Sequence, residues 1–186
     1  MKIFCIGANK TGTSSLTCAM NKLGFLNLPE IVGYTTELRT PELRNNINEV
    51  LEYIKKNDEF DFFEDIPFCF FDNYKLIEKE FPESKFILTI RDSEDWFCSV
   101  IRWVNKMNCS DYYEFIYECL PNIDNKKIII EKHEKRNREI IEYFQNQKKN
   151  NLLIMNIPAG DNWNKLCPFL DKEVLKDKFP HENINK

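Results

Sequence analysis

The chain has 186 residues, of which 42% are hydrophobic and 13% aromatic, and its formal net charge is −4. This apolar content excludes a chain that is disordered throughout, and no apolar run approaches the roughly 20 residues that span a membrane. The charge balance gives no basic surface of the kind that binds nucleic acid. We therefore expect a soluble globular protein whose partners include neither nucleic acid nor a membrane.

Predicted strands and helices alternate from the start of the chain. The first apolar run, Lys2–Ile6, ends at Gly7 and indicates a buried strand. A helix is expected over Thr13–Leu23, because Gly24 then stands just after its C-cap. The next expected elements are a short strand at Phe25–Leu28, a helix that begins at Thr40-Pro41-Glu42, a strand at Phe60–Glu64 and a helix near Phe71–Phe81.

The same alternation continues to the end of the chain. The clearest strand is Lys85–Ile90. It is followed by expected helices at Glu94–Met107 (capped by Asp92 or Ser93), Ser110–Cys119 and Asn125–Lys149, a strand at Leu152–Asn156 and a helix at Trp163–Leu170. Because no repeat or flexible linker divides it, residues 1–186 are predicted to form one domain. The alternation is typical of an α/β fold with a parallel sheet.

Seven cysteines are scattered along the chain, and none has the C-x-x-C spacing of zinc and redox motifs. The apolar run before Gly7 is also too short for the core of a secretory signal. We therefore expect reduced cysteines in a cytoplasmic protein without a metal.

The strongest chemical signal is the loop between the first strand and the first helix, residues 7–15, which reads G-A-N-K-T-G-T-S-S. Backbone N–H groups in such a loop, together with the helix dipole, favour a bound anion. A nucleoside-triphosphate P-loop reads G-x-x-x-x-G-K-[ST], but here Thr13 replaces its lysine and Lys10 precedes the second glycine. No aspartate fits the usual magnesium role either. The alternative is a capped glycine turn with Lys10 in solvent.

A second signal follows the strand Lys85–Ile90, which ends at Arg91, eight residues before Ser99. An arginine at the carboxyl edge of a parallel strand faces the ligand crevice, and its guanidinium binds phosphate through two parallel hydrogen bonds. Ser99 would add a hydroxyl from the following helix. The alternative is a surface arginine that pairs with Asp95.

Together the two motifs resemble those of sulfotransferases that use 3′-phosphoadenosine 5′-phosphosulfate (PAPS). The resemblance implies a three-layer P-loop-type α/β fold, with a central parallel sheet flanked by helices, and PAPS as co-substrate without a metal. It also implies that Arg91 and Ser99 bind the 3′-phosphate, and that Lys10 binds the 5′-phosphosulfate. The loop amides that would assist Lys10 are those of Thr11, Gly12, Thr13, Ser14 and Ser15. Residues 81–88, 162–170 and 179–183 are similar to segments of a small single-domain branch.

Transfer of a sulfuryl group needs a base close to the acceptor proton. Cytosolic sulfotransferases carry a catalytic histidine two residues before a proline, and Asp65 occupies that position before Pro67. Asp65 is therefore the first candidate base and Glu64 the second; the alternative is an aspartate that bonds within its own turn. Of the two histidines, His133 lies in a charged helix segment and is expected to be solvated, whereas His181 is expected to be structural.

The chain also departs from the family pattern at two points. Ser15 and Leu16 stand where an aromatic residue often stacks on adenine, and a closing Arg-Lys-Gly loop is not recognisable. Two alternatives to a sulfotransferase stay open: a P-loop phosphotransferase, and a catalytically inactive nucleotide-binding protein of sulfotransferase type. The expected acceptor is a small molecule or a glycan, selected by the loops Val32–Thr40 and Asn105–Asn125.

Overall fold

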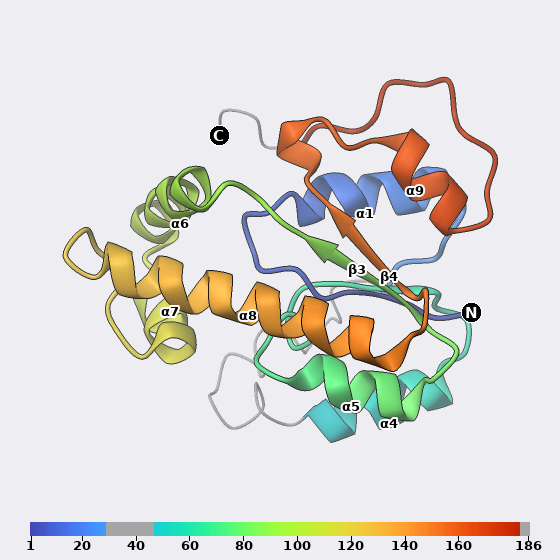
Figure 1. Ribbon diagram of the computed structural model, residues 1–186, viewed down its shortest axis with the longest axis horizontal. Helices are drawn as coiled ribbons and strands as arrows, with labels where there is room; N and C mark the ends of the chain where they lie inside the picture. Colours follow the sequence, from blue (N-terminus) through green and yellow to red (C-terminus); the bar gives the residue numbers. More distant parts are fainter. Residues whose placement is uncertain (29–46, 183–186) are drawn as a thin grey trace.

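The structure is a computed structural model that describes residues 1–28 and 47–182. At its centre lies a sheet of four parallel strands in the order β2-β1-β3-β4 (Figure 1). The strands are β1 (Ile3–Cys5), β2 (Phe62–Phe63), β3 (Lys85–Thr89) and β4 (Leu152–Met155). In the register of the sheet, Phe4 lies opposite Phe63 on one side and Phe86 on the other. The carboxyl ends of all four strands meet at one edge, where α/β folds bind their ligands.

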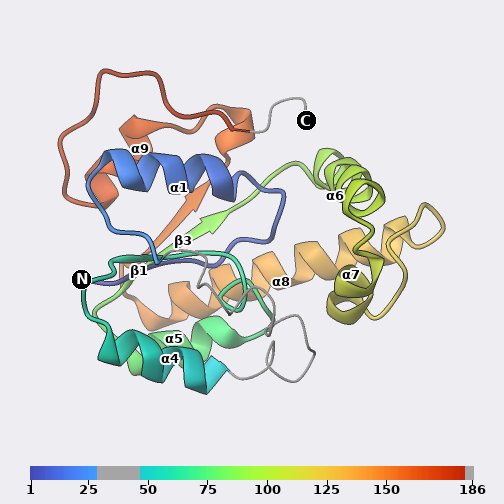
Figure 2. The ribbon, with the colours of Figure 1, turned by 180° about the vertical axis from the view of Figure 1, so that it is seen from behind.

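Helices cover both faces of this sheet (Figures 1 and 2). Side chains alternate along β1: Ile3 and Cys5 pack toward α1 and α9, whereas Phe4 packs toward α4, α5 and α8. The bounds are α1 (Thr13–Lys22), α9 (Trp163–Phe169), α4 (Ile47–Lys56), α5 (Asn73–Glu80) and α8 (Lys126–Gln147). The three-layer α/β fold that the sequence predicts is confirmed.

A third group of helices lies beyond the edge of the sheet. β3 leads into α6 (Ser93–Met107), which is followed by α7 (Ser110–Tyr117), and both pack with α8 around buried Trp96. Figure 1 shows this group at the left, next to the loop that joins β1 to α1. After β4 comes the short helix η1 (Ile157–Ala159). None of the described helices is both long and apolar enough to cross a membrane.

Most predicted elements are present within a few residues of their expected bounds. Asp92 is the cap of α6, because its side chain accepts hydrogen bonds from the N–H groups of Glu94 and Asp95. The predicted strand Phe25–Leu28 is wrong: Asn27 forms one isolated parallel bridge to Phe62. The predicted helix start at Thr40-Pro41-Glu42 lies outside the described residues.

The prediction that His133 is solvated is wrong. Its side chain is only 1% exposed, and its ring stacks on Trp96 with 3.8 Å between ring centroids. The reason is helical spacing: His133 shares one stripe of α8 with buried Ile129, Ile140 and Phe144, although charged residues surround it in the sequence. Burial, followed by the nearby Arg136, lowers the pKa of His133 to about 3, so the buried ring is neutral.

Candidate functional site

The loop after β1 is held tightly against the end of β3. A Cβ at Gly7 would lie 2.0 Å from Thr89 Oγ1 and 2.6 Å from the Thr89 carbonyl oxygen, so this approach requires glycine. Thr11 Oγ1 donates to the Ala8 carbonyl at 2.6 Å and lies 2.6 Å from Thr89 Oγ1. The Thr11 side chain is fully buried and fixes the loop, which leaves its backbone N–H as its possible contribution to anion binding.

The N-terminus of α1 faces this loop without a capping side chain. Its N-cap is Gly12, with φ 105°, and among the described residues no side chain caps the helix and no acidic residue stands in its first turn. The first N–H groups of a helix have no partner within the helix, and together with the dipole they attract anions. Thr13 is half-buried and Ser14 is exposed. This helix end is therefore suited to a phosphate or sulfate group.

Ser15 has a different role from its neighbours. Its side chain is 4% exposed, and its Oγ accepts a hydrogen bond of 2.9 Å from the N–H of Glu182. The hydroxyl thus ties the C-terminal segment to α1, and its backbone N–H is the group that remains for an anion.

Arg91 lies at the carboxyl edge of the sheet, beside the loop. Its Nη1 donates a long hydrogen bond of 3.5 Å to the Lys10 carbonyl oxygen. Its Nε is buried and has no hydrogen-bond partner within the described part of the chain, where no ion pair with Asp95 is present either. Ser99 is half-buried on α6. The guanidinium is therefore held next to the anion loop with a buried donor that no group in residues 1–28 or 47–182 satisfies.

The Lys10 side chain lies close to other positively charged side chains. Its Nζ lies 4.1 Å from the centroid of the Trp103 ring on α6, a cation–π contact, so the side chain does not extend into open solvent. Burial lowers the pKa of Lys10, and the positive charges of Arg91 and Arg102, and more weakly Lys106, lower it further. A bound anion would offset the repulsion among these cations.

Asp65 lies at the carboxyl end of β2, in the left-handed region with φ 67°. Its Oδ1 accepts a hydrogen bond of 2.7 Å from Asn9 Nδ2, so the carboxylate contacts the residue that precedes Lys10. Glu64, the preceding residue, is half-buried. Its charge is the largest cause, after burial, of the rise in the Cys5 pKa to about 12.

Asn9 is a site residue that sequence reasoning missed. Its Oδ1 accepts hydrogen bonds from Tyr112 Oη at 2.7 Å and from the Cys69 thiol at 3.7 Å, and its carbonyl oxygen accepts one of 3.0 Å from Trp96 Nε1. Its position inside the anion loop, next to Lys10, was the available signal. The contacts themselves come from α6, α7 and the segment after β2, so the tertiary fold alone brings them together.

The comparisons with known proteins agree with this geometry. A family model described as "Sulfotransferase domain" matches residues 2–186. The chain belongs to this sulfotransferase family. It is also similar to "Ava biosynthesis cluster protein M" of Aspergillus versicolor, with 26% identity over 214 aligned residues that cover 97% of this chain and 80% of the relative.

In this sulfotransferase domain, the loop after β1, Asp65 and Arg91 lie at the carboxyl edge of the sheet, whereas Ser99 lies on α6. Lys10 and Arg91 are in direct contact, Asp65 is joined to the same loop through Asn9, and Thr13 and Ser14 begin α1. Thr11 and Ser15 use their side chains to build the fold. Within the described residues no group of three or more His, Cys, Asp or Glu side chains could hold a metal.

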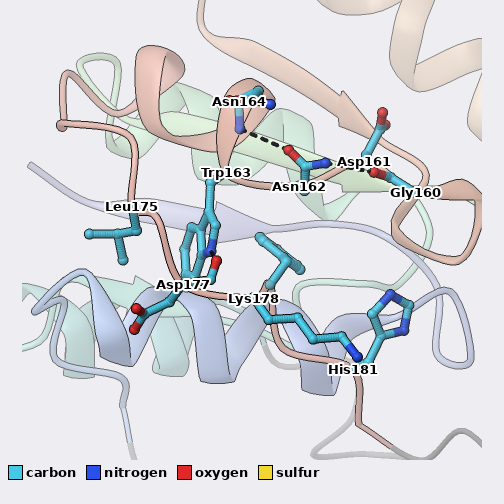
Figure 3. Close-up of a pocket in the computed structure, with 10 residues that line it drawn as sticks. Gly160, Asp161, Asn162, Trp163, Asn164, Leu175, Asp177, Lys178 and His181 are labelled. Atoms are coloured by element: carbon cyan, nitrogen blue, oxygen red, sulfur yellow. Dashed lines mark hydrogen bonds between the residues drawn. The ribbon is translucent and has the colours of Figure 1, made fainter.

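His181 of the sulfotransferase domain is exposed. It lines an open pocket of about 350 Å³ between the start of α9 and the C-terminal segment (Figure 3). There Trp163 Nε1 donates to the Asp177 carbonyl at 2.8 Å, and buried Phe179 packs edge-on against the Trp163 ring. The packing of this segment therefore depends on Phe179, and none of the predicted phosphate-binding residues lines the pocket.

Proposed function

We propose that this member of the sulfotransferase family transfers the sulfuryl group of PAPS to a hydroxyl or amine of a small molecule or glycan. The observation that carries the proposal is the meeting of Lys10 and Arg91, which belong to the two separate phosphate motifs. Among the described residues, Arg91 Nε has no hydrogen-bond partner and no side chain caps α1, and both features fit a ligand with two anionic groups.

Each residue has a distinct part in this proposal. Lys10 and the backbone N–H groups of residues 11–15 bind the 5′-phosphosulfate, and Arg91 and Ser99 bind the 3′-phosphate. The acceptor oxygen or nitrogen forms a new bond to sulfur while the bond from sulfur to the bridging oxygen breaks. The electron pair of that broken bond leaves with 3′-phosphoadenosine 5′-phosphate (PAP). Lys10 neutralises the charge on the leaving oxygen. Asp65 takes the acceptor proton, with Glu64 as the second candidate.

The two alternative functions make different predictions about ligands. A P-loop phosphotransferase would need the lysine after the second glycine, where this chain has Thr13. An inactive relative would bind the nucleotide without turnover. Seven free thiols, of which Cys5, Cys69 and Cys167 are buried, are consistent with the cytoplasmic location that we propose.

Calorimetry separates the candidate ligands. We expect PAP to bind without added metal, and ATP with magnesium to bind far more weakly. Preferential binding of ATP with magnesium would contradict the proposal. Incubation with PAPS labelled in the sulfuryl group and a panel of phenols, amines and glycans then tests transfer. PAP binding together with no labelled acceptor, and no release of labelled sulfate above the rate without protein, would favour the inactive relative.

A further inference from the structure

A chain of hydrogen bonds leads from α7 through the anion loop to the candidate base. Tyr112 Oη donates to Asn9 Oδ1, and Asn9 Nδ2 donates to Asp65 Oδ1, both at 2.7 Å. These lengths are at the short end of the usual range. The three side chains come from separate parts of the sequence and meet at the carboxyl edge of the sheet.

The direction of these hydrogen bonds follows from their chemistry. An ionised carboxylate only accepts hydrogen bonds, so Asn9 must present its amide nitrogen to Asp65 and its oxygen to Tyr112. Burial raises the pKa of Tyr112 well above its usual range, and the charges of Cys69 and Asp65 add to the rise. The phenol therefore stays protonated and donates to Asn9.

The backbone of Asn9 is fixed as well. Its carbonyl oxygen accepts the indole N–H of Trp96, which is fully buried and stacked on His133. Asn9 is thus held on its backbone by α6 and on its side chain by α7. Rotation of its amide would break the contacts with Tyr112 and with Asp65 at the same time.

We propose that Asn9 and Tyr112 are positioning residues that orient the Asp65 carboxylate toward the acceptor bound beside the sulfate loop. The inference rests on the proposed role of Asp65 as the base. Asn9 precedes Lys10 directly, so the same loop that holds the sulfuryl donor also fixes the direction of proton transfer. Geometry of this kind, maintained through a second layer of contacts, is what keeps a base within reach of its proton.

A double-mutant cycle tests this proposal. Tyr112→Phe keeps the ring in contact with Phe70 and removes the donor to Asn9, so we expect kcat to fall about five- to tenfold, the effect of losing one hydrogen bond. KM for PAPS should stay the same. In an Asp65→Asn background, Tyr112→Phe should change kcat less than twofold, because the residue acts through Asp65.

Tyr113→Phe is the matched control. Tyr113 is the adjacent residue and is buried, but its hydroxyl has no hydrogen-bond partner among the described residues. This variant should keep the native kcat. If Tyr112→Phe lowers kcat by the same factor in the native chain and in Asp65→Asn, Tyr112 does not act through Asp65 and the proposal is overturned. Native activity in Asp65→Asn would instead overturn the proposed base, so the two failures are distinguishable.

A second measurement needs no turnover. In the NMR spectrum of the full ligand-free chain, the side-chain amide of Asn9 is identified by its loss in Asn9→Ser. Its proton shifts should change in Asp65→Asn, and its exchange with water should become faster in Tyr112→Phe, but not in Tyr113→Phe. Amide signals that respond to neither Asp65→Asn nor Tyr112→Phe would show that the contact is absent in solution and would overturn the proposal.

Discussion

At the residue scale, the site combines a cluster of positive charges with the carboxylate of Asp65, which accepts a hydrogen bond from the amide of Asn9. Lys10 lies among Arg91, Arg102 and Lys106, whose charges lower its pKa. Such a cluster is unfavourable until an anion arrives, because like charges repel most strongly where solvent is partly excluded. Asp65 lies next to the same loop, where Asn9 donates to its Oδ1. In the proposed mechanism the cations bind the anionic donor and Asp65 takes the acceptor proton.

Lys10→Ala should lower turnover by ~10²–10³, because one donor that stabilises the developing charge is lost. The fold should persist, since the Lys10 side chain contacts the partly exposed Trp103 rather than the core. Labelled-PAPS turnover and a thermal melt measure the two properties. Lys22→Ala, at the exposed far end of α1, is the control. Near-native turnover in Lys10→Ala would remove this lysine from the chemistry.

Arg91→Ala should weaken PAP binding by ~1.5–3 kcal/mol, the range for charge-assisted hydrogen bonds. Binding of an analogue that lacks the 3′-phosphate should barely change, because the guanidinium is proposed to contact that group. Calorimetry with both nucleotides measures the difference. If both nucleotides lose the same affinity, Arg91 does not read the 3′ position and acts through its contact with the Lys10 carbonyl.

Asp65→Asn should reduce turnover by ~10²–10⁴, because the side chain keeps its size but cannot take a proton. PAP affinity should remain native, since Asp65 is proposed to contact the acceptor and not the nucleotide. Steady-state kinetics and calorimetry test both statements, with Glu64→Gln as the paired variant. An inactive Glu64→Gln together with an active Asp65→Asn would move the base to Glu64.

At the scale of elements, α8 explains how a charged sequence segment produces a buried contact. His133 and Arg136 are one turn apart and both turn inward, and Arg136 Nη2 donates to the Ile6 carbonyl at the end of β1 at 3.1 Å. The His133 ring stacks on Trp96 of α6, and Trp96 in turn holds Asn9. The helix therefore supports the site from behind, through aromatic packing and through the hydrogen bond of Arg136.

The neutral state of His133 predicts a dependence of stability on pH. Its pKa is about 3 in the fold against roughly 6.5 in an unfolded chain, so between these values the unfolded state binds more protons. Its contribution is fully present above pH ~6.5, and stability falls by up to about 1.4 kcal/mol for each unit of pH below it. In urea melts, His133→Gln should show a shallower acid dependence than the native chain. His181→Gln, which keeps His133, should retain the native slope; equal slopes in all three proteins would contradict the assignment.

At the scale of the whole molecule, a ligand that bridges the two motifs would join elements distant in sequence. The loop after β1 lies near the start of the chain, whereas Arg91 follows β3 and Ser99 lies on α6. Ser15 also binds the C-terminal segment. A ligand that spans these parts stabilises the folded state by mass action, because it binds only when they are assembled.

Saturation with PAP should therefore raise the melting temperature of the whole chain. At 100 times its dissociation constant the stabilisation is about 2.7 kcal/mol, which corresponds to roughly 5–10 °C for a chain of this length. Differential scanning fluorimetry measures the shift, and Arg91→Ala is the control, with a smaller shift at the same concentration. A shift with ATP and magnesium that equals the shift with PAP would contradict a preference for the 3′-phosphate.

The sequence alone determined the α/β class and the two phosphate motifs, because both are local patterns. Each motif can be recognised within a segment of about ten residues: one is a glycine loop between a strand and a helix, and the other is an arginine at a strand end. Hydrophobic periodicity likewise located nearly all the described elements. At Phe25–Leu28 the apolar pattern was short, and the structure has one bridge to β2 there in place of the expected strand.

Only the tertiary structure decided which side chains of the loop build the fold. Thr11 and Ser15 looked equivalent to Thr13 and Ser14, but contacts with Thr89 and Glu182, far away in sequence, bury their hydroxyls. The burial of His133 and the hydrogen bonds that join Tyr112, Asn9 and Asp65 depend in the same way on α6, α7 and α8 meeting at one edge of the sheet. Such contacts join residues as many as 167 positions apart, and no local pattern of residue types encodes which of them will meet.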